Sequence, residues 1–182
     1  MKTDEFADLY AEELKAEGGV ISGEQFVDEC QVESDLELLL PATYVTGSSE
    51  RMLLYRELDS LTLDKDVEAF RNRLIDRFGP VPSETEELLR IVPLRRLAAR
   101  LGAEKVFLKG GRMSLFFISN PESPYYQSQA FGKVIAYMMK YTRRCDLREQ
   151  NTRRSMLVKD VKNVETAVGV LQEIVAMQVE EG

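Results

Sequence analysis

Histidine is absent from the 182 residues of this chain. Without an imidazole the chain has no Ser-His or Cys-His nucleophile pair and no histidine general base. Most zinc sites also lose a common ligand. Catalysis would therefore have to rest on carboxylates or lysines, and the sequence would have to show positive evidence for them.

Cysteine is scarce as well. Cys30 and Cys145 lie far apart in the sequence and outside any metal-like spacing, so we expect buried or partly buried free thiols in a reducing compartment. The body of the chain has one paired glycine, Gly110-Gly111, and no G-x-x-x-x-G-K-[ST] string. We therefore expect no metal, no cofactor and no nucleotide hydrolysis.

Long apolar runs are also missing. Nothing in the sequence approaches the roughly 18 apolar residues of a membrane span. The start, MKTDEFADLY, lacks the basic and apolar regions of a signal peptide. A cytoplasmic protein without membrane contact is the expectation.

Charge is distributed unevenly. Twelve acidic and two basic residues fall within residues 1–37, a net charge of −10, whereas the whole chain carries −7. The remainder is therefore mildly basic, at +3. Because phosphate binding needs clustered Lys and Arg, an acidic chain of this kind is a poor general nucleic-acid binder.

Apolar periodicity predicts four helices and one strand in the first part of the chain. Gly79, Pro80 and Pro82 would end the third of these helices. The predicted elements are helix 4–16 before Gly18-Gly19, extended strand 30–40, and helices 49–60, 65–78 and 83–102.

Local signals refine these boundaries. Ser48 or Ser49 is available as an N-cap of the second helix. Ser83 and Glu86 have capping-box spacing, and together with Glu84 and Glu87 they place carboxylates in a first helical turn, where the helix dipole already favours them. Pro93 should kink the fourth helix or split it in two. We read these acids as structural and predict a non-catalytic domain.

The rest of the chain repeats one plan, hairpin then helix. Lys109-Gly110-Gly111-Arg112 is a tight-turn signal between two strands. This order favours an α+β domain: a short antiparallel sheet built from two β-hairpins, with helices packed on it and a helical subregion ahead of it. The predicted elements are strands 104–108 and 112–118, helix 125–141, strands 145–149 and 153–158 around Gln150-Asn151, and helix 162–178.

Basic residues gather between 133 and 154, with tyrosines nearby. Cations interleaved with aromatic rings can bind single strands by charge and stacking, and the alternative is that the tyrosines complete a core and the cations form a solvated rim. We favour the second interpretation, in which the cations are solvated and bind no ligand. Nucleic-acid binding is therefore kept as the alternative function. Its candidate contacts are Lys140, Arg143, Arg144, Arg153 and Arg154.

The sharpest local string is Leu74-Ile75-Asp76-Arg77-Phe78-Gly79, followed by Pro82. It resembles the L-I-D-R-F-G-x-x-P signature of the C-terminal domain of transcription-repair coupling factors. Further residues upstream and downstream are similar to that family's P-x-x-Y-[IV], R-x-x-x-Y-[KR] and L-x-x-L-A-x-x-L-G patterns. They are Pro41, Tyr44, Val45, Arg51, Tyr55, Arg56, Leu89, Leu94, Arg95, Ala98, Leu101 and Gly102.

The resemblance runs from about residue 4 to the end and is closest between 36 and 102. It implies a regulatory, protein-binding domain of an ATP-driven DNA translocase in transcription-coupled nucleotide-excision repair. In that family the domain packs on the parent protein's own UvrA-binding module and so hides it. RNA polymerase and UvrA are then indirect partners.

The resemblance also implies the contact residues. Asp76 and Arg77 match the family's acidic and basic positions at the end of this helix, whereas Arg73 departs from relatives that can carry an acid there. Under the same resemblance, residues 1–40 are an acidic arm from the end of the translocation module, helix then strand. Residues 41–182 are then the regulatory domain.

Overall fold

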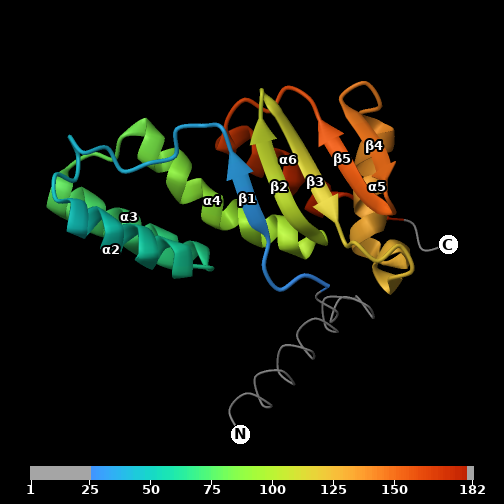
Figure 1. Cartoon of the computed structure of the whole chain (residues 1–182), viewed down its shortest axis with the longest axis horizontal. Helices are drawn as coiled ribbons and strands as arrows, with labels where there is room; N and C mark the ends of the chain where they lie inside the picture. Colours follow the sequence, from blue (N-terminus) through green and yellow to red (C-terminus); the bar gives the residue numbers. More distant parts are fainter. Residues whose placement is uncertain (1–25, 180–182) are drawn as a thin grey trace, which may run out of the picture.

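The computed structural model describes residues 26–179. The expected helix at 4–16, with Gly18-Gly19 after it, lies outside them. Six helical segments and five strands follow in an α+β arrangement (Figure 1). In chain order they are β1 (Gln31–Ser34), α2 (Ser48–Ser60), α3 (Asp64–Phe78), α4 (Ser83–Arg100), β2 (Ala103–Lys109), β3 (Arg112–Phe117), the 3₁₀ turn η1 (Pro124–Gln127), α5 (Gln129–Lys140), β4 (Cys145–Gln150), β5 (Arg153–Val158) and α6 (Val164–Ala176).

The strands form one sheet in the order β1-β2-β3-β5-β4. The two predicted hairpins are its antiparallel pairs, β2 with β3 and β4 with β5, and β3 joins them antiparallel to β5. The predicted α+β class is confirmed. One feature is added: β1 lies parallel to β2, with Gln31 opposite Lys105, so the sheet is mixed.

Both hairpin turns use positive φ. Gly110 and Gly111 have φ of 61° and 72°, which glycine adopts without steric cost, as a tight two-residue turn needs. The second turn lies at Asn151 and Thr152, with φ of 53° and 64°, one residue beyond the predicted centre. Asparagine tolerates this region, whereas a β-branched threonine rarely does.

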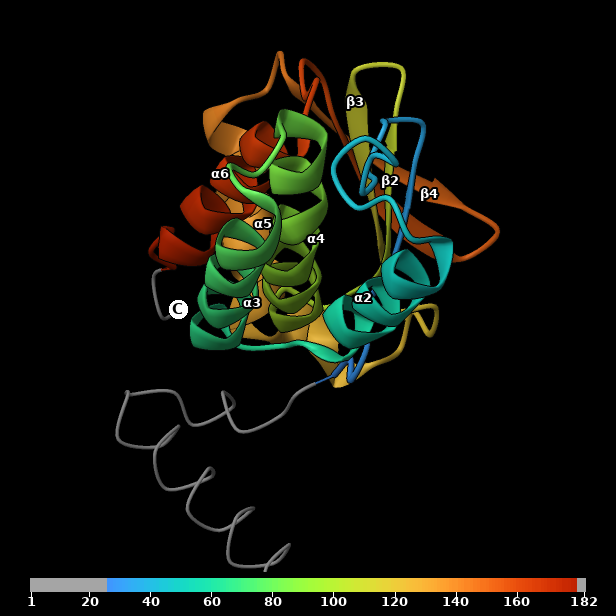
Figure 2. The ribbon, with the colours of Figure 1, turned by 90° about the vertical axis from the view of Figure 1, so that its left-hand side faces the viewer.

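Helices α4, α5 and α6 lie together on one side of the sheet (Figure 2). Alternate strand residues point at them: Val106, Leu115 and Met156 face one another across three strands and are fully buried. Val27 and Cys30, which precede β1, belong to the same core. The boundary placed at residue 40 stays a prediction, but residues 26–40 share the sheet and core of the body.

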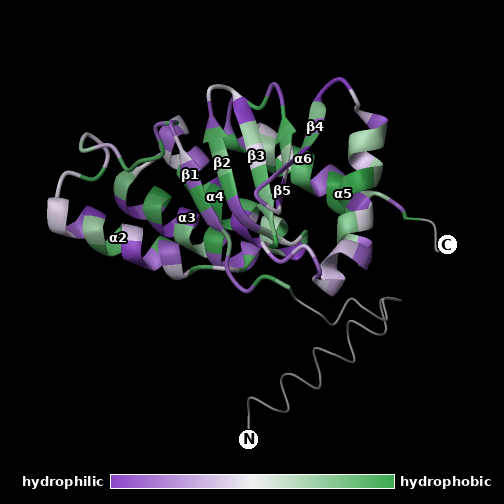
Figure 3. Ribbon diagram, turned by 45° about the vertical axis from the view of Figure 1, so that its right-hand side comes forward, coloured by the Kyte–Doolittle hydropathy of each residue, from purple (hydrophilic) through white to green (hydrophobic). Residues whose placement is uncertain are grey.

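A second, smaller core lies between α2, α3 and the first half of α4, to the left of the sheet in Figure 1. Phe70 and Leu74 of α3 are each 1% exposed. Figure 3 shows hydrophilic and hydrophobic residues alternating along α2 and α3, as expected of helices with one buried face. This is the predicted helical subregion, and α4 runs from it onto the sheet.

Several local predictions were wrong. Gly47 and Pro82 hold the N-cap positions of α2 and α4, and neither end has a side-chain cap; Ser83 donates instead to Glu84 Oε1, at 2.9 Å. Pro93 does not split α4, which runs on to Arg100, and the alternative, a kink, stays a prediction. The helix expected at 125–141 is η1 and α5, separated by Ser128, whose hydroxyl accepts from the Phe131 N–H as the N-cap of α5.

Candidate protein-docking surface

The predicted interface residues lie on the last turns of α3. The end of this helix is fixed by Gly79, at φ 89°, and by the Tyr44 hydroxyl, which donates to the Gly79 carbonyl at 2.8 Å and approaches that of Leu74 at 3.2 Å. Leu74 is buried. The residues next to it, Asp76 and Arg77, are therefore held on the outside of a well-defined helix end.

Arg73 and Arg77 already have partners within the domain. Arg77 pairs with Glu50 and Arg73 pairs with Glu57, both on α2. Arg77 also lies over the ring of Phe78, 4.9 Å from its centroid. The two arginines link α2 to α3 at the surface of the domain.

Asp76 differs from the two arginines. It is exposed, and its carboxylate makes no hydrogen bond or ion pair with any residue in the described part of the chain. Ile75 beside it is 41% exposed, and Met52 and Leu53 on α2 are 56% and 64% exposed. This pair of helices thus presents an unpaired carboxylate, two internally paired arginines and exposed apolar side chains.

The second set of candidates is not brought together. Lys140 pairs with Glu173 on α6 at 3.6 Å, and Arg144 donates to the Lys159 carbonyl at 3.0 Å. Arg153 and Arg154 are neighbours on β5 and so point to opposite faces of the sheet. Arg143 is exposed beyond the end of α5. These five cations do not share one groove.

The two cysteines are free and buried, as predicted. Burial raises the pKa of the Cys30 thiol to about 12 and also raises that of Cys145. Neither thiol is activated as a nucleophile needs. Between residues 26 and 179 no three metal-binding side chains come together, and no helix there is long and apolar enough to cross a bilayer.

The carboxylates near the start of α4 have partners on other helices. Glu86 accepts two hydrogen bonds from Arg71 of α3, one from Nη2 at 2.7 Å and one from Nε at 3.0 Å. Glu87 reaches α6, where its two oxygens accept from the backbone N–H groups of Val164 and Glu165, at 2.8 and 3.1 Å. Each carboxylate therefore joins two helices.

Family comparison adds to this geometry. The family model for the TRCF domain matches residues 34–128, which include all of α2, α3 and α4 and the first hairpin. The chain belongs to the TRCF domain family.

Relatives of this TRCF domain are much longer proteins. The transcription-repair-coupling factor of Rickettsia typhi is 26% identical over 149 residues, and that of Rickettsia bellii 29% identical over 150. These alignments cover 80% and 79% of this chain. The chain spans about 13% of the length of either relative.

The fold agrees with a solved structure. A crystal structure of the C-terminal domain of a transcription-repair coupling factor superposes with a TM-score of 0.62 at 18% identity. The match covers 81% of this chain and 93% of the other. The TRCF domain described here therefore has that domain's fold.

The motif residues of the TRCF domain have structural roles that their spacing did not reveal. The Tyr55 hydroxyl accepts from the Leu40 N–H at 2.7 Å, and Arg51 donates to the Val45 carbonyl at 2.7 Å. The buried Thr85 hydroxyl donates to the Leu39 carbonyl at 2.9 Å. Together they fasten the segment after β1 to the helices, whereas Ile75, Asp76 and Arg77 at the end of α3 are exposed.

Proposed function

We propose that this TRCF domain is a regulatory protein-binding part of a longer DNA-translocating repair protein, active in transcription-coupled nucleotide-excision repair in the cytoplasm. In this proposal it docks on the parent's UvrA-binding module and keeps that module inaccessible until RNA polymerase is engaged. Family membership and the short share of the relatives' length support a role within a larger protein.

The observation that carries the docking proposal is the unpaired Asp76 at the fixed end of α3, beside the exposed Ile75. A charged and partly apolar contact gives specificity and modest net energy, which suits an interface that must open. Arg77 and Arg73 also make the interface reversible. Each can pair either with its glutamate on α2 or with a carboxylate of the partner, so the arginines keep an ion pair when the interface opens.

The test is calorimetry of the chain with the parent's isolated UvrA-binding module. We expect Asp76→Arg to weaken binding by about tenfold, the size of one lost charge contact. Glu122→Arg is the matched control, because it makes the same charge change on the exposed loop between β3 and η1.

The same two variants belong in the full parent protein, where covalent linkage raises the effective concentration of the domain. Asp76→Arg should increase both UvrA capture and basal ATPase, and Glu122→Arg should leave them unchanged. If Asp76→Arg also leaves both unchanged, the end of α3 is not the docking site.

A further inference from the structure

The face of the sheet that points away from α4, α5 and α6 carries an unusual set of side chains. We call it the open sheet face. It consists of alternate residues on the five strands, so its members follow from the pairing register. Its charged and aromatic members are Glu33, Lys105, Phe107, Lys109, Arg112, Phe116, Asp146, Arg148 and Arg153.

Positive charge dominates this face although the chain as a whole carries −7. By the register, five cations stand against two acids, Glu33 and Asp146, and a third acid, Glu104, lies at the bulge of β2 before Lys105. Glu33 pairs with Lys105 at 3.2 Å and with Lys109 at 3.6 Å, and the hydrogen bond from Lys105 lowers the pKa of Glu33. The three arginines of the face make no ion pair with the described residues, so their charge is available to a ligand.

Two aromatic rings lie at the centre of the face. Phe107 on β2 and Phe116 on β3 meet edge to face, 5.3 Å between ring centroids, and both are half-buried. Cations surround them: Lys105 and Lys109 lie 4.9 and 5.1 Å from the Phe107 centroid, and Arg153 lies 5.5 Å from that of Phe116.

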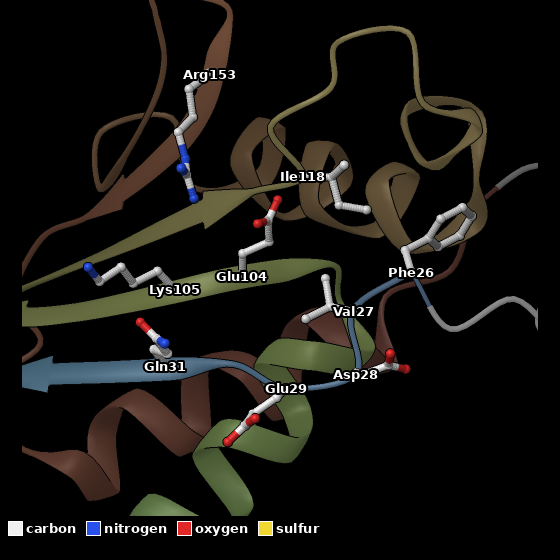
Figure 4. A pocket seen from close by; sticks show the side chains of 9 residues that line it. All are labelled: Phe26, Val27, Asp28, Glu29, Gln31, Glu104, Lys105, Ile118 and Arg153. Atoms are coloured by element: carbon white, nitrogen blue, oxygen red, sulfur yellow. The ribbon is translucent and has the colours of Figure 1, made fainter.

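A cleft of about 610 Å³ opens beside the rings. Arg153 from β5 and Glu104 from β2 point into it (Figure 4). Its lining also includes the apolar Phe26 and Ile118 and the charged Asp28, Glu29 and Lys105. The Nε of Arg153 is buried and has no hydrogen-bond partner among the described residues. Since a buried unpaired donor costs free energy, this group is suited to an acceptor brought by a ligand.

We propose that the open sheet face binds single-stranded nucleic acid. Flat sheets with aromatic residues on neighbouring central strands bind unpaired bases by stacking, and surrounding cations bind the phosphates. Here the exposed Arg112 and Arg148 flank the rings as phosphate contacts, and the cleft at Arg153 accepts a base edge. A single strand fits better than an acidic peptide, because its bases and phosphates alternate along the chain as the rings and cations alternate on this face.

This site is independent of the docking surface on α3. It also differs from the five candidate contacts named from the sequence, with which it shares only Arg153. The net charge of −7 describes the whole chain. The fold places most of the acidic residues elsewhere and gathers cations on the open sheet face, so an acidic composition does not exclude nucleic-acid binding there.

The first test is fluorescence anisotropy of the whole chain with a labelled oligothymidylate of about twelve nucleotides. We expect binding that weakens between about 50 and 200 mM salt, and a Kd raised at least about tenfold when Arg112→Glu and Arg148→Glu are combined. Lys65→Glu with Arg56→Glu is the control pair, because both residues are exposed, lie on α3 and α2 off the face and give the same net charge.

The second test separates stacking from charge. Phe107→Leu with Phe116→Leu should weaken binding about fivefold or more and leave the salt dependence unchanged, with a thermal melt to show that the chain stays folded. Absence of binding at low salt overturns the proposal, as does equal weakening by the control pair. An unaffected Kd in the ring variant, or equal competition by polyglutamate, assigns the face to an acidic protein segment and overturns it too.

Discussion

The sheet region and the helical region of this domain are stabilised in different ways. Among the described residues, 26 buried side chains form the core under the sheet, whereas eight form the core between α2, α3 and the first half of α4. The helical region compensates with polar links: two ion pairs from α3 to α2, the Arg71–Glu86 pair, and hydroxyls that bond backbone carbonyls. Exposed ion pairs of this kind each contribute little, so the outer links of the helical region can be exchanged at modest cost.

Removing an aromatic ring from the smaller core should produce the largest difference in stability between the helical region and the sheet region. Phe70→Ala leaves a cavity in a cluster of eight residues and should cost about 3–5 kcal/mol. Native-state hydrogen exchange should then show α2 and α3 losing protection while β2, β3 and β5 keep theirs. Equal loss across both regions would mean that α4 couples them into one cooperative unit.

Two helix-ending glycines give a matched comparison between the regions. Gly79 and Gly102 have φ of 89° and 84°, so alanine is strained at either position, by about 1–3 kcal/mol. A Cβ at Gly79 meets nothing within 4 Å, but one at Gly102 would lie 2.1 Å from the Tyr125 ring. Overpacking should bring the cost of Gly102→Ala to about 2–5 kcal/mol. Denaturant titration of both variants measures the difference, and equal costs would show that Tyr125 moves aside freely.

The smallest effect should come from the charged links of the helical region. Arg77→Gln removes an ion pair in which the arginine side chain is 60% exposed, so we expect a loss below about 1 kcal/mol. Thermal melts of this variant and of Glu50→Gln check it. A loss as large as that of Phe70→Ala would show that the link, rather than the core, holds α2 in place.

The sequence predicted those helices and turns that depend on residues only a few positions apart. Apolar spacing located α3 and α6, and Gly110-Gly111 located the first hairpin. Capping at α2 and α4 was mispredicted because the helices begin at Ser48 and Ser83 themselves, so Gly47 and Pro82 hold the N-cap positions and the serines lie inside the first turn. The resemblance supplied Asp76 and Arg77, but nothing near them in the sequence showed that Glu50 would pair with Arg77.

Distant partners were beyond sequence reasoning. Glu87 caps α6 from a position far back in the chain, and a single sequence carries no sign of that pairing. The open sheet face is an intermediate case. Lys105, Phe107 and Lys109 alternate visibly along β2, but Phe116 and Arg153 join them only once the strand order is known.

The parallel pairing of β1 with β2 has a kinetic consequence. Gln31 reaches Lys105 only by closing a loop that contains the entire helical region, and closure of an unfolded loop costs more entropy as its length grows. The two hairpins need no such closure and can form early. Strand β1 should therefore join the sheet after α2, α3 and α4 have compacted the loop, so the helical region acts as a template that completes the sheet during folding.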